Sequence, residues 1–186
     1  MKEKGARIIN LYGGPGCSKS TTAAGIFSVL KLHGVNCELC TEYAKDLTWE
    51  SRNMTLQNQI YIFGKQYHRL WRVVNQVDVV ITDSPILLSN IYDTNNDGAF
   101  RNLVLDTYNK FNNYNFFLER VKKYNPSGRS QSLEEAINVD SIIKRRLDEY
   151  KITYKHVIGD YSCINSISAL MLDELGINNR FSISMV

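Results

Sequence analysis

The stretch that decides the fold is Gly13-Gly14-Pro15-Gly16-Cys17-Ser18-Lys19-Ser20-Thr21. An apolar run, residues 8–12, precedes it and is typical of a buried strand, and residues 22–30 after it are typical of a helix. A strand, a glycine-rich turn, a lysine, a hydroxyl and a helix form the layout of a phosphate-binding P-loop. A plain Gly-Pro turn before a helix is the alternative, and the flanking strand and helix disfavour it.

Each part of this loop has an expected task. Successive backbone N–H groups, together with the start of the helix, form a site for an anion. We expect Lys19 to reach the β- and γ-phosphates of ATP and the Ser20 hydroxyl to hold Mg²⁺. Ser18 stands where the P-loop pattern has glycine, a residue that accepts unusual backbone angles. We therefore expect a strained Ser18 or a slightly different loop, with nucleotide affinity as the property affected. The predicted nucleotide-binding residues are Gly13, Gly14, Pro15, Gly16, Cys17, Ser18, Lys19, Ser20 and Thr21.

The composition predicts a single globular domain over residues 1–186, with 44% hydrophobic and 22% charged residues. The sequence has no apolar run of about 18 residues and no apolar leader, so we expect no membrane span and no secretory signal. Four scattered cysteines suggest a reducing compartment, the cytoplasm, or the host cytoplasm if the protein is viral. Cys37 and Cys40 fall on a predicted strand and would face opposite sides, which makes them a poor metal chelate. The net charge of +3 neither implies nor excludes nucleic-acid binding.

Strands and helices alternate along the chain, which predicts a five-stranded parallel sheet with helices on both faces, the α/β fold of P-loop kinases. Ser132 and Glu135 fit a capping box that opens one helix. The expected strands are 6–12, 35–40, 77–82, 114–121 and 156–158. The expected helices are 19–33, a short one after Thr41, 56–74, one ending near Tyr92, 100–111, 132–150 and 162–175.

Three charged residues follow the ends of predicted strands: Lys19, Glu42 and Asp83. Ligands of parallel sheets bind beyond these carboxyl ends, so we expect the three side chains to meet at an active site. Glu42 is the candidate general base, and a solvated carboxylate at a helix start is the alternative. Asp83 is expected to hold Mg²⁺ or to orient the acceptor hydroxyl. A helix cap is its alternative, with Ser84 and Pro85 opening the helix.

Arg120 and Arg129 bracket a predicted lid at about residues 122–132. Arginine suits a lid that closes on phosphates, because its fork matches two oxygens and stays charged. The basic residues Lys122 and Lys123, and the run Lys144-Arg145-Arg146, are equally consistent with solvated surface.

Aromatic and amide side chains between residues 49 and 71 could contact an acceptor base. The candidates are Trp49, Phe63, Tyr67 and Trp71, with Gln57, Gln59 and Gln66 as readers of base edges. Aromatic residues at helical spacing are more often core, so we expect one or two of the four to contact substrate. Glutamines on a helix are usually surface.

The phosphate loop, Thr41–Lys45, Asp83-Ser84-Pro85 and the arginines of the lid together resemble small P-loop nucleoside kinases over residues 6–150. Glu-Tyr-Ala-Lys, from Glu42, is similar to the Glu-Tyr-Ala-Arg element of ribosylnicotinamide kinase domains. The order of carboxylate, tryptophan, aspartate and lid also resembles deoxynucleoside kinases. The resemblance implies ATP and Mg²⁺ as cofactors and a nucleoside-type hydroxyl as acceptor.

The whole chain also resembles small P-loop kinases encoded by large bacteriophages. One activity of that group is phosphorylation of 5-hydroxymethyldeoxyuridine within phage DNA, a step of thymidine hypermodification. The resemblance implies Lys19 and Ser20 for ATP and a carboxylate base, and its acceptor rests on overall likeness rather than on a motif.

Three alternatives remain open. A kinase of free nucleosides or ribosylnicotinamide needs no DNA surface. A nucleoside monophosphate kinase needs extra arginines around the acceptor, where the sequence offers Arg52, Arg69 and Arg72. An ATPase switch or motor normally needs a longer chain with further elements.

Overall fold

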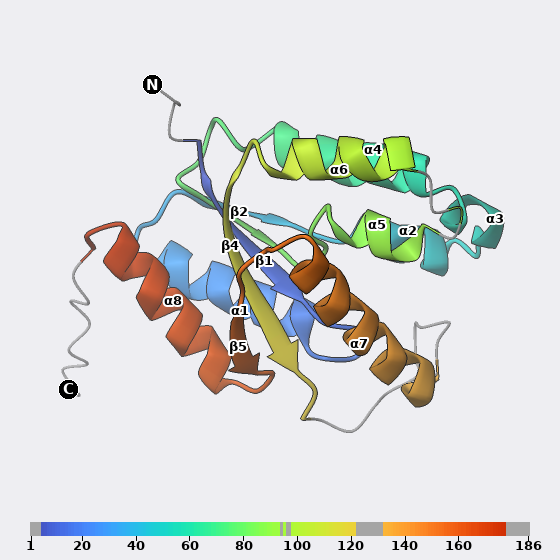
Figure 1. The fold of residues 1–186 in the computed structure, drawn as a ribbon. Helices are drawn as coiled ribbons and strands as arrows, with labels where there is room; N and C mark the ends of the chain where they lie inside the picture. Colours follow the sequence, from blue (N-terminus) through green and yellow to red (C-terminus); the bar gives the residue numbers. More distant parts are fainter. Residues whose placement is uncertain (1–4, 94, 96–97, 122–131, 178–186) are drawn as a thin grey trace.

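A parallel sheet of five strands forms the centre of the molecule (Figure 1). The structure, a computed structural model, describes residues 5–93, 95, 98–121 and 132–177. The strands are β1 (Arg7–Tyr12), β2 (Cys37–Cys40), β3 (Val79–Thr82), β4 (Asn112–Glu119) and β5 (Lys155–Ile158). Their order is β2-β3-β1-β4-β5, and every neighbouring pair is parallel. The expected fold class is confirmed.

Strand β1 lies at the middle of the sheet. Its residues from Ile8 to Tyr12 are all buried, as are all four residues of β3, which explains why both sequences lack polar alternation. β1 pairs with β3 on one side and with β4 on the other. The phosphate loop after β1 therefore lies between the segments that follow β3 and β4.

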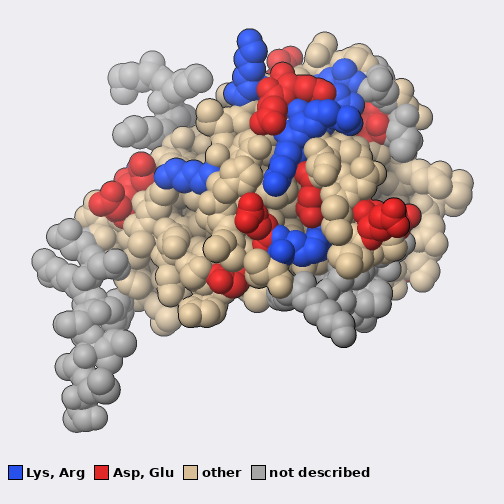
Figure 2. All heavy atoms as spheres, turned by 60° about the horizontal axis from the view of Figure 1, so that its bottom comes forward, with Lys and Arg blue, Asp and Glu red and all other residues tan. Residues whose placement is uncertain are grey.

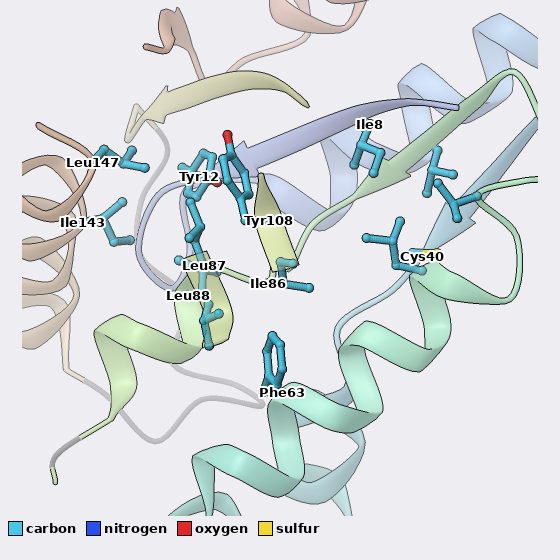
Figure 3. Packing of buried hydrophobic residues seen from close by; sticks show 14 of the residues in the cluster. Ile8, Tyr12, Cys40, Phe63, Ile86, Leu87, Leu88, Tyr108, Ile143 and Leu147 are labelled. Atoms are coloured by element: carbon cyan, nitrogen blue, oxygen red, sulfur yellow. The ribbon is translucent and has the colours of Figure 1, made fainter. Parts of the chain in front are cut away.

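Helices cover both faces of the sheet. Helices α1 (Lys19–Leu32) and α8 (Ser162–Glu174) pack on one face, against Ile9 and Leu11 of β1. The other face, with Ile8 and Tyr12, is covered by α4 (Gln59–Trp71), α5 (Leu88–Tyr92), α6 (Gly98–Tyr108) and α7 (Leu133–Glu149). Figure 3 shows Phe63, Leu88, Tyr108 and Ile143, one from each of these helices, in that cluster. None of the helices within the described ranges is both long and apolar enough to cross a membrane.

Helices α2 (Tyr43–Trp49) and α3 (Asn53–Leu56) follow β2, and α3 lies at the right-hand end of Figure 1. The helix expected over 56–74 is present as α4, but it begins only at Gln59 and ends at Trp71, after the separate short helix α3. The physical reason is Asn58, whose side chain accepts a hydrogen bond from the Tyr61 N–H and caps α4.

Other local predictions are confirmed. Glu135 N–H donates to Ser132 Oγ at 3.2 Å, and Ser132 N–H donates to Glu135 Oε2 at 2.6 Å, which completes the capping box. Cys37 and Cys40 pack in separate clusters on opposite faces of the sheet. The predicted lid, with Lys122, Lys123 and Arg129, falls almost entirely outside the described residues.

Candidate active site

The phosphate loop connects β1 to α1 and has three residues with positive φ. Gly13 has φ 133°, Gly16 has φ 82° and Ser18 has φ 75°. Ser18 thus adopts the left-handed conformation that glycine would accept without cost. Its Oγ is buried, with no hydrogen-bond partner among the residues that the structure describes. The serine keeps the loop geometry and carries the strain that the sequence predicts.

Lys19 folds back over this loop. Its Nζ donates to the carbonyl oxygens of Gly13, at 2.6 Å, and Gly14, at 3.0 Å. Burial acts to lower the pKa of Lys19, but neighbouring groups outweigh burial and leave the pKa above its ordinary value. Those neighbours are Cys17, Tyr92, Glu42 and Asp83. The lysine therefore stays cationic and lies within electrostatic reach of both predicted carboxylates.

Glu42 lies between β2 and α2, at the N-cap position of α2, where its side chain makes no capping hydrogen bond. Burial raises the pKa of Glu42; Lys19 opposes this shift and Asp83 adds to it. A carboxylate whose pKa is raised towards neutrality accepts a proton more readily. The environment fits a general base better than a solvated surface carboxylate.

Asp83 directly follows β3 and is only 3% exposed. Its Oδ1 has no hydrogen-bond partner in the described part of the chain. Helix α5 begins at Leu88, and the Ser84 N–H donates to Thr82 Oγ1 at 3.1 Å. The helix-cap alternative for Asp83 therefore has no support, and an orphaned buried carboxylate oxygen is suited to a cation.

The residues fit Mg²⁺ bound mainly by phosphates and water. Ser20 is exposed in the first turn of α1, and Asp83 supplies the orphaned oxygen. No group of three or more histidine, cysteine or acidic residues that could hold a metal occurs within residues 5–93, 95, 98–121 and 132–177. Mg²⁺ commonly uses only one or two carboxylates besides substrate oxygens, so this donor set is sufficient.

Arg120 and Asp140 hold the outer side of the phosphate loop. Asp140 Oδ1 accepts from the Gly14 N–H, and its Oδ2 accepts from Arg120 Nη2 at 2.8 Å. Arg120 Nη1 donates to the Pro15 carbonyl. We call these contacts the Arg120–Asp140 clamp; both side chains are mostly buried, at 11% and 18% exposed. The clamp places Arg120 beside the phosphate loop, with its guanidinium bonded to Asp140 and to the Pro15 carbonyl.

Helix α7 presses so closely on Gly14 that no side chain fits there. A Cβ on Gly14 would lie 2.6 Å from the Ala136 carbonyl oxygen and 2.9 Å from Asp140 Oδ1. Sequence reasoning missed Asp140, because it lies far along the chain from the loop and belongs to no motif. Its only signal was its place on the helix that follows the predicted lid.

One further residue near the site was missed, and a second one was expected in a different environment. Tyr92 ends α5, and its pKa is raised by burial and by Glu42, against the influence of Lys19. Gln66 is buried rather than on the surface, which corrects the expectation for this glutamine. Its side chain accepts from the Tyr43 N–H at 2.9 Å and donates to the Thr41 carbonyl at 3.3 Å. Gln66 thereby fixes the backbone on both sides of Glu42.

The four aromatic candidates divide into two pairs. Phe63 stacks on Tyr67 within the core cluster. Trp49 and Trp71 are 66% and 56% exposed and remain available to a ligand.

Figure 2 views the molecule from the side to which the arrowheads of β4 and β5 point in Figure 1. Lysine and arginine side chains are interspersed there with acidic ones, without a continuous surface of either sign. This agrees with the small net charge of +3.

Comparisons with known proteins agree with this geometry. A family profile described as an AAA domain matches residues 8–162. Among solved structures, deoxyadenosine kinase from M. mycoides with bound dATP is 19% identical, with a TM-score of 0.53, covering 91% of this chain and 99% of that chain. The same kinase with the products dCMP and dCDP is 18% identical, with a TM-score of 0.52, covering 91% and 98%. The sequence matches no curated protein. These likenesses show the fold of a P-loop kinase.

Proposed function

This chain belongs to the AAA-domain family whose profile spans residues 8–162, and we propose that it is a kinase that transfers the γ-phosphate of ATP to a hydroxyl group. The observation that carries the proposal is the electrostatic coupling of Lys19, Glu42 and Asp83 beside the phosphate loop. A cation for phosphates, a carboxylate with a raised pKa and an orphaned carboxylate are the groups that phosphoryl transfer to an alcohol requires.

In this mechanism the loop amides and Lys19 hold the β- and γ-phosphates. Glu42 accepts the proton of the acceptor hydroxyl while that oxygen forms a bond to the γ-phosphorus and the bond to ADP breaks. Ser20 and Asp83 would hold Mg²⁺, which neutralises charge on the phosphate oxygens. Arg120 supports the loop and, with Arg129, would counter the charge of the transferring group.

The acceptor we propose is a nucleoside-type hydroxyl. More specifically, we propose the 5-hydroxymethyl group of 5-hydroxymethyldeoxyuridine in DNA, supported by the resemblance to small bacteriophage kinases. A free nucleoside or ribosylnicotinamide is the second candidate, consistent with the fold shared with deoxyadenosine kinase.

A nucleoside monophosphate acceptor is less well supported. Arg69 contacts Thr41 and Asp46, and Arg52 pairs with Glu50 at 3.3 Å. Two of the three arginines near the acceptor region are therefore already engaged in the protein. A phosphate acceptor would have to displace these contacts.

The test is incubation with γ-labelled ATP and, in parallel, DNA containing 5-hydroxymethyluracil, free nucleosides and nucleoside monophosphates. We expect label in the modified DNA, and none with the Lys19→Ala variant. Label only in free nucleosides would replace the DNA acceptor with a nucleoside. Release of inorganic phosphate with no labelled acceptor would favour the ATPase switch.

A further inference from the structure

We propose that helices α2, α3 and α4 form a surface that binds a single-stranded segment of nucleic acid next to the acceptor site. This inference rests on the proposed function and deepens it, because it assigns the surface that would hold a polynucleotide acceptor. We call it the α2–α4 surface, residues 43–72. It follows Glu42 directly in the chain, so a bound strand would lie beside the candidate base.

The α2–α4 surface holds the entire net charge of the protein. It contains five cations and two acids, an excess of three, and the whole chain has a net charge of +3. The other residues together are therefore neutral. The cations are Lys45, Arg52, Lys65, Arg69 and Arg72, and the acids are Asp46 and Glu50.

Both acids are neutralised within the surface. Asp46 pairs with Arg69, and Glu50 pairs with Arg52 at 3.3 Å. Three cations remain: Lys45, Lys65 and Arg72. The Arg72 guanidinium has no hydrogen bond or ion pair with any described residue, and Lys65 lies 5.5 Å from the centre of the Tyr61 ring. These side chains can contact phosphates without breaking an ion pair of the protein.

A hollow of about 340 Å³ opens between α2, α4 and the end of β2. Burial raises the pKa of the Cys40 thiol in its wall to about 11, so the thiol carries no charge that would repel a phosphate. Arg72 and Arg69 oppose this shift, whereas the acidic neighbours Glu38 and Asp83 add to it. The lining residues are Leu39, Cys40, Thr41, Asp46, His68, Arg69 and Arg72.

Both tryptophans of the chain belong to the α2–α4 surface. Trp49 lies almost one turn after Asp46, and Trp71 lies between the lining residues Arg69 and Arg72. Their side chains are 66% and 56% exposed, and the His68 ring stacks on Trp71 with centroids 6.0 Å apart. Exposed aromatic rings among cations are how proteins bind single strands, because every base offers a face for stacking.

The other described basic run is less available. Arg145 and Arg146 of α7 both lie near Glu149, at 3.9 and 2.8 Å. No exposed tryptophan accompanies them, because both tryptophans lie in the α2–α4 surface. The α2–α4 surface is therefore the better partner for a single strand.

The test is fluorescence anisotropy of a labelled single-stranded oligonucleotide, titrated with the full chain at several salt concentrations. Contacts of three phosphates predict a slope of about −2 in a plot of log affinity against log salt. Arg72→Ala should weaken binding roughly tenfold at low salt and make the slope shallower by about 0.7. Trp71→Ala should weaken binding by a similar factor without changing the slope. Arg145→Ala is the matched control and should bind like the wild type.

The outcomes separate this inference from the kinase itself. Lys19→Ala should bind the oligonucleotide normally, and Arg72→Ala should phosphorylate a free nucleoside normally. Absence of oligonucleotide binding, or an equal loss of oligonucleotide affinity in Arg72→Ala and Arg145→Ala, would overturn the proposed role of the α2–α4 surface. The kinase proposal would still stand. Normal binding without phosphate transfer to any acceptor would overturn the kinase and leave the surface intact. Equal competition by a free nucleotide would show a mononucleotide site instead.

Discussion

The phosphate loop, which we propose binds ATP, and the α2–α4 surface, which we propose binds the acceptor strand, are built differently. Lys19 and Arg120 donate hydrogen bonds to carbonyl oxygens of the loop, and Asp140 accepts one from the Gly14 N–H. The α2–α4 surface instead leaves large apolar side chains in water, including Met54 at 80% and Ile60 at 63% exposed. A loop fixed before binding loses little entropy when a phosphate arrives, whereas an open surface gains its order from the ligand. The donor half is thus preorganised, and the acceptor half is adaptable.

The largest effect on phosphate transfer should come from a substitution in the phosphate loop, at Lys19. Lys19→Ala removes the charge that faces the β- and γ-phosphates, and we expect phosphate transfer to fall at least about 100-fold. Far-ultraviolet circular dichroism should stay unchanged, because the hydrogen bonds of the lysine side chain go to the loop itself, to the Gly13 and Gly14 carbonyls and to Cys17 Sγ. Lys31→Ala, an exposed lysine near the end of α1, is the control. Near-normal turnover in Lys19→Ala would contradict the assignment of the loop.

Substitutions of Glu42 and Asp83 test the separate roles proposed for these two carboxylates. Glu42→Gln should lower turnover roughly 100-fold with little change in ATP affinity, because a base acts in the transition state. Asp83→Asn should instead raise the Mg²⁺ concentration needed for half-maximal activity. Steady-state kinetics at varied ATP and Mg²⁺ separate the two, and an identical ATP-affinity defect in both variants would refute the division of roles.

Glu42 also predicts a dependence of stability on pH. Its folded pKa lies above the ordinary value of 4.5, so the folded state binds more protons than the unfolded state in that range. This carboxyl therefore lowers the free energy of unfolding as the pH rises from 4.5 through the folded pKa. Glu42→Gln does not titrate and should be more stable than the wild type at neutral pH, with the difference vanishing below pH 4.5. Urea denaturation at several pH values measures this, and a less stable variant at neutral pH would contradict it.

Substitutions in the Arg120–Asp140 clamp test whether its contacts with the phosphate loop contribute to catalysis. Asp140→Ala removes the acceptor of the Gly14 N–H and of Arg120 Nη2, and we expect a loss of roughly tenfold in kcat/KM. Asp140→Asn keeps one acceptor oxygen and should retain more activity. An Asp140→Asn variant as impaired as Asp140→Ala would show that the negative charge, rather than the hydrogen bond to Gly14, matters.

The smallest effect concerns backbone strain in the loop. Ser18→Gly removes a left-handed serine and should raise the free energy of unfolding by about 1 kcal/mol. Lys151 directly follows the C-cap of α7 and has φ 55°, in the same backbone region, so Lys151→Gly should give a similar gain. Only Ser18→Gly should also change ATP affinity, measured by calorimetry. Equal ATP affinities in both variants would show that the strained backbone of Ser18 does not affect nucleotide binding.

The sequence was most informative where chemistry depends on neighbours in the chain. The loop spacing, Glu42 after β2 and Asp83 after β3 were predictable, because strand ends meet at one edge of a parallel sheet. Asp140 and Tyr92 were not, since each reaches the site through tertiary packing from a distant helix. Gln66 was misjudged for a related reason: its partners are backbone groups of Thr41 and Tyr43, and helical spacing does not register such contacts.

The α2–α4 surface is one uninterrupted segment of the chain between the neighbouring strands β2 and β3. No residue of the phosphate loop or of the Arg120–Asp140 clamp comes from that segment. A single recombination event in the gene can therefore replace the whole segment 43–72 and, with it, the exposed side chains of this surface. Substrate choice can then diverge between descendants while the residues that bind ATP are inherited unaltered, provided that the buried residues of the segment are kept: Leu47, Ile62, Phe63, Gln66 and Leu70.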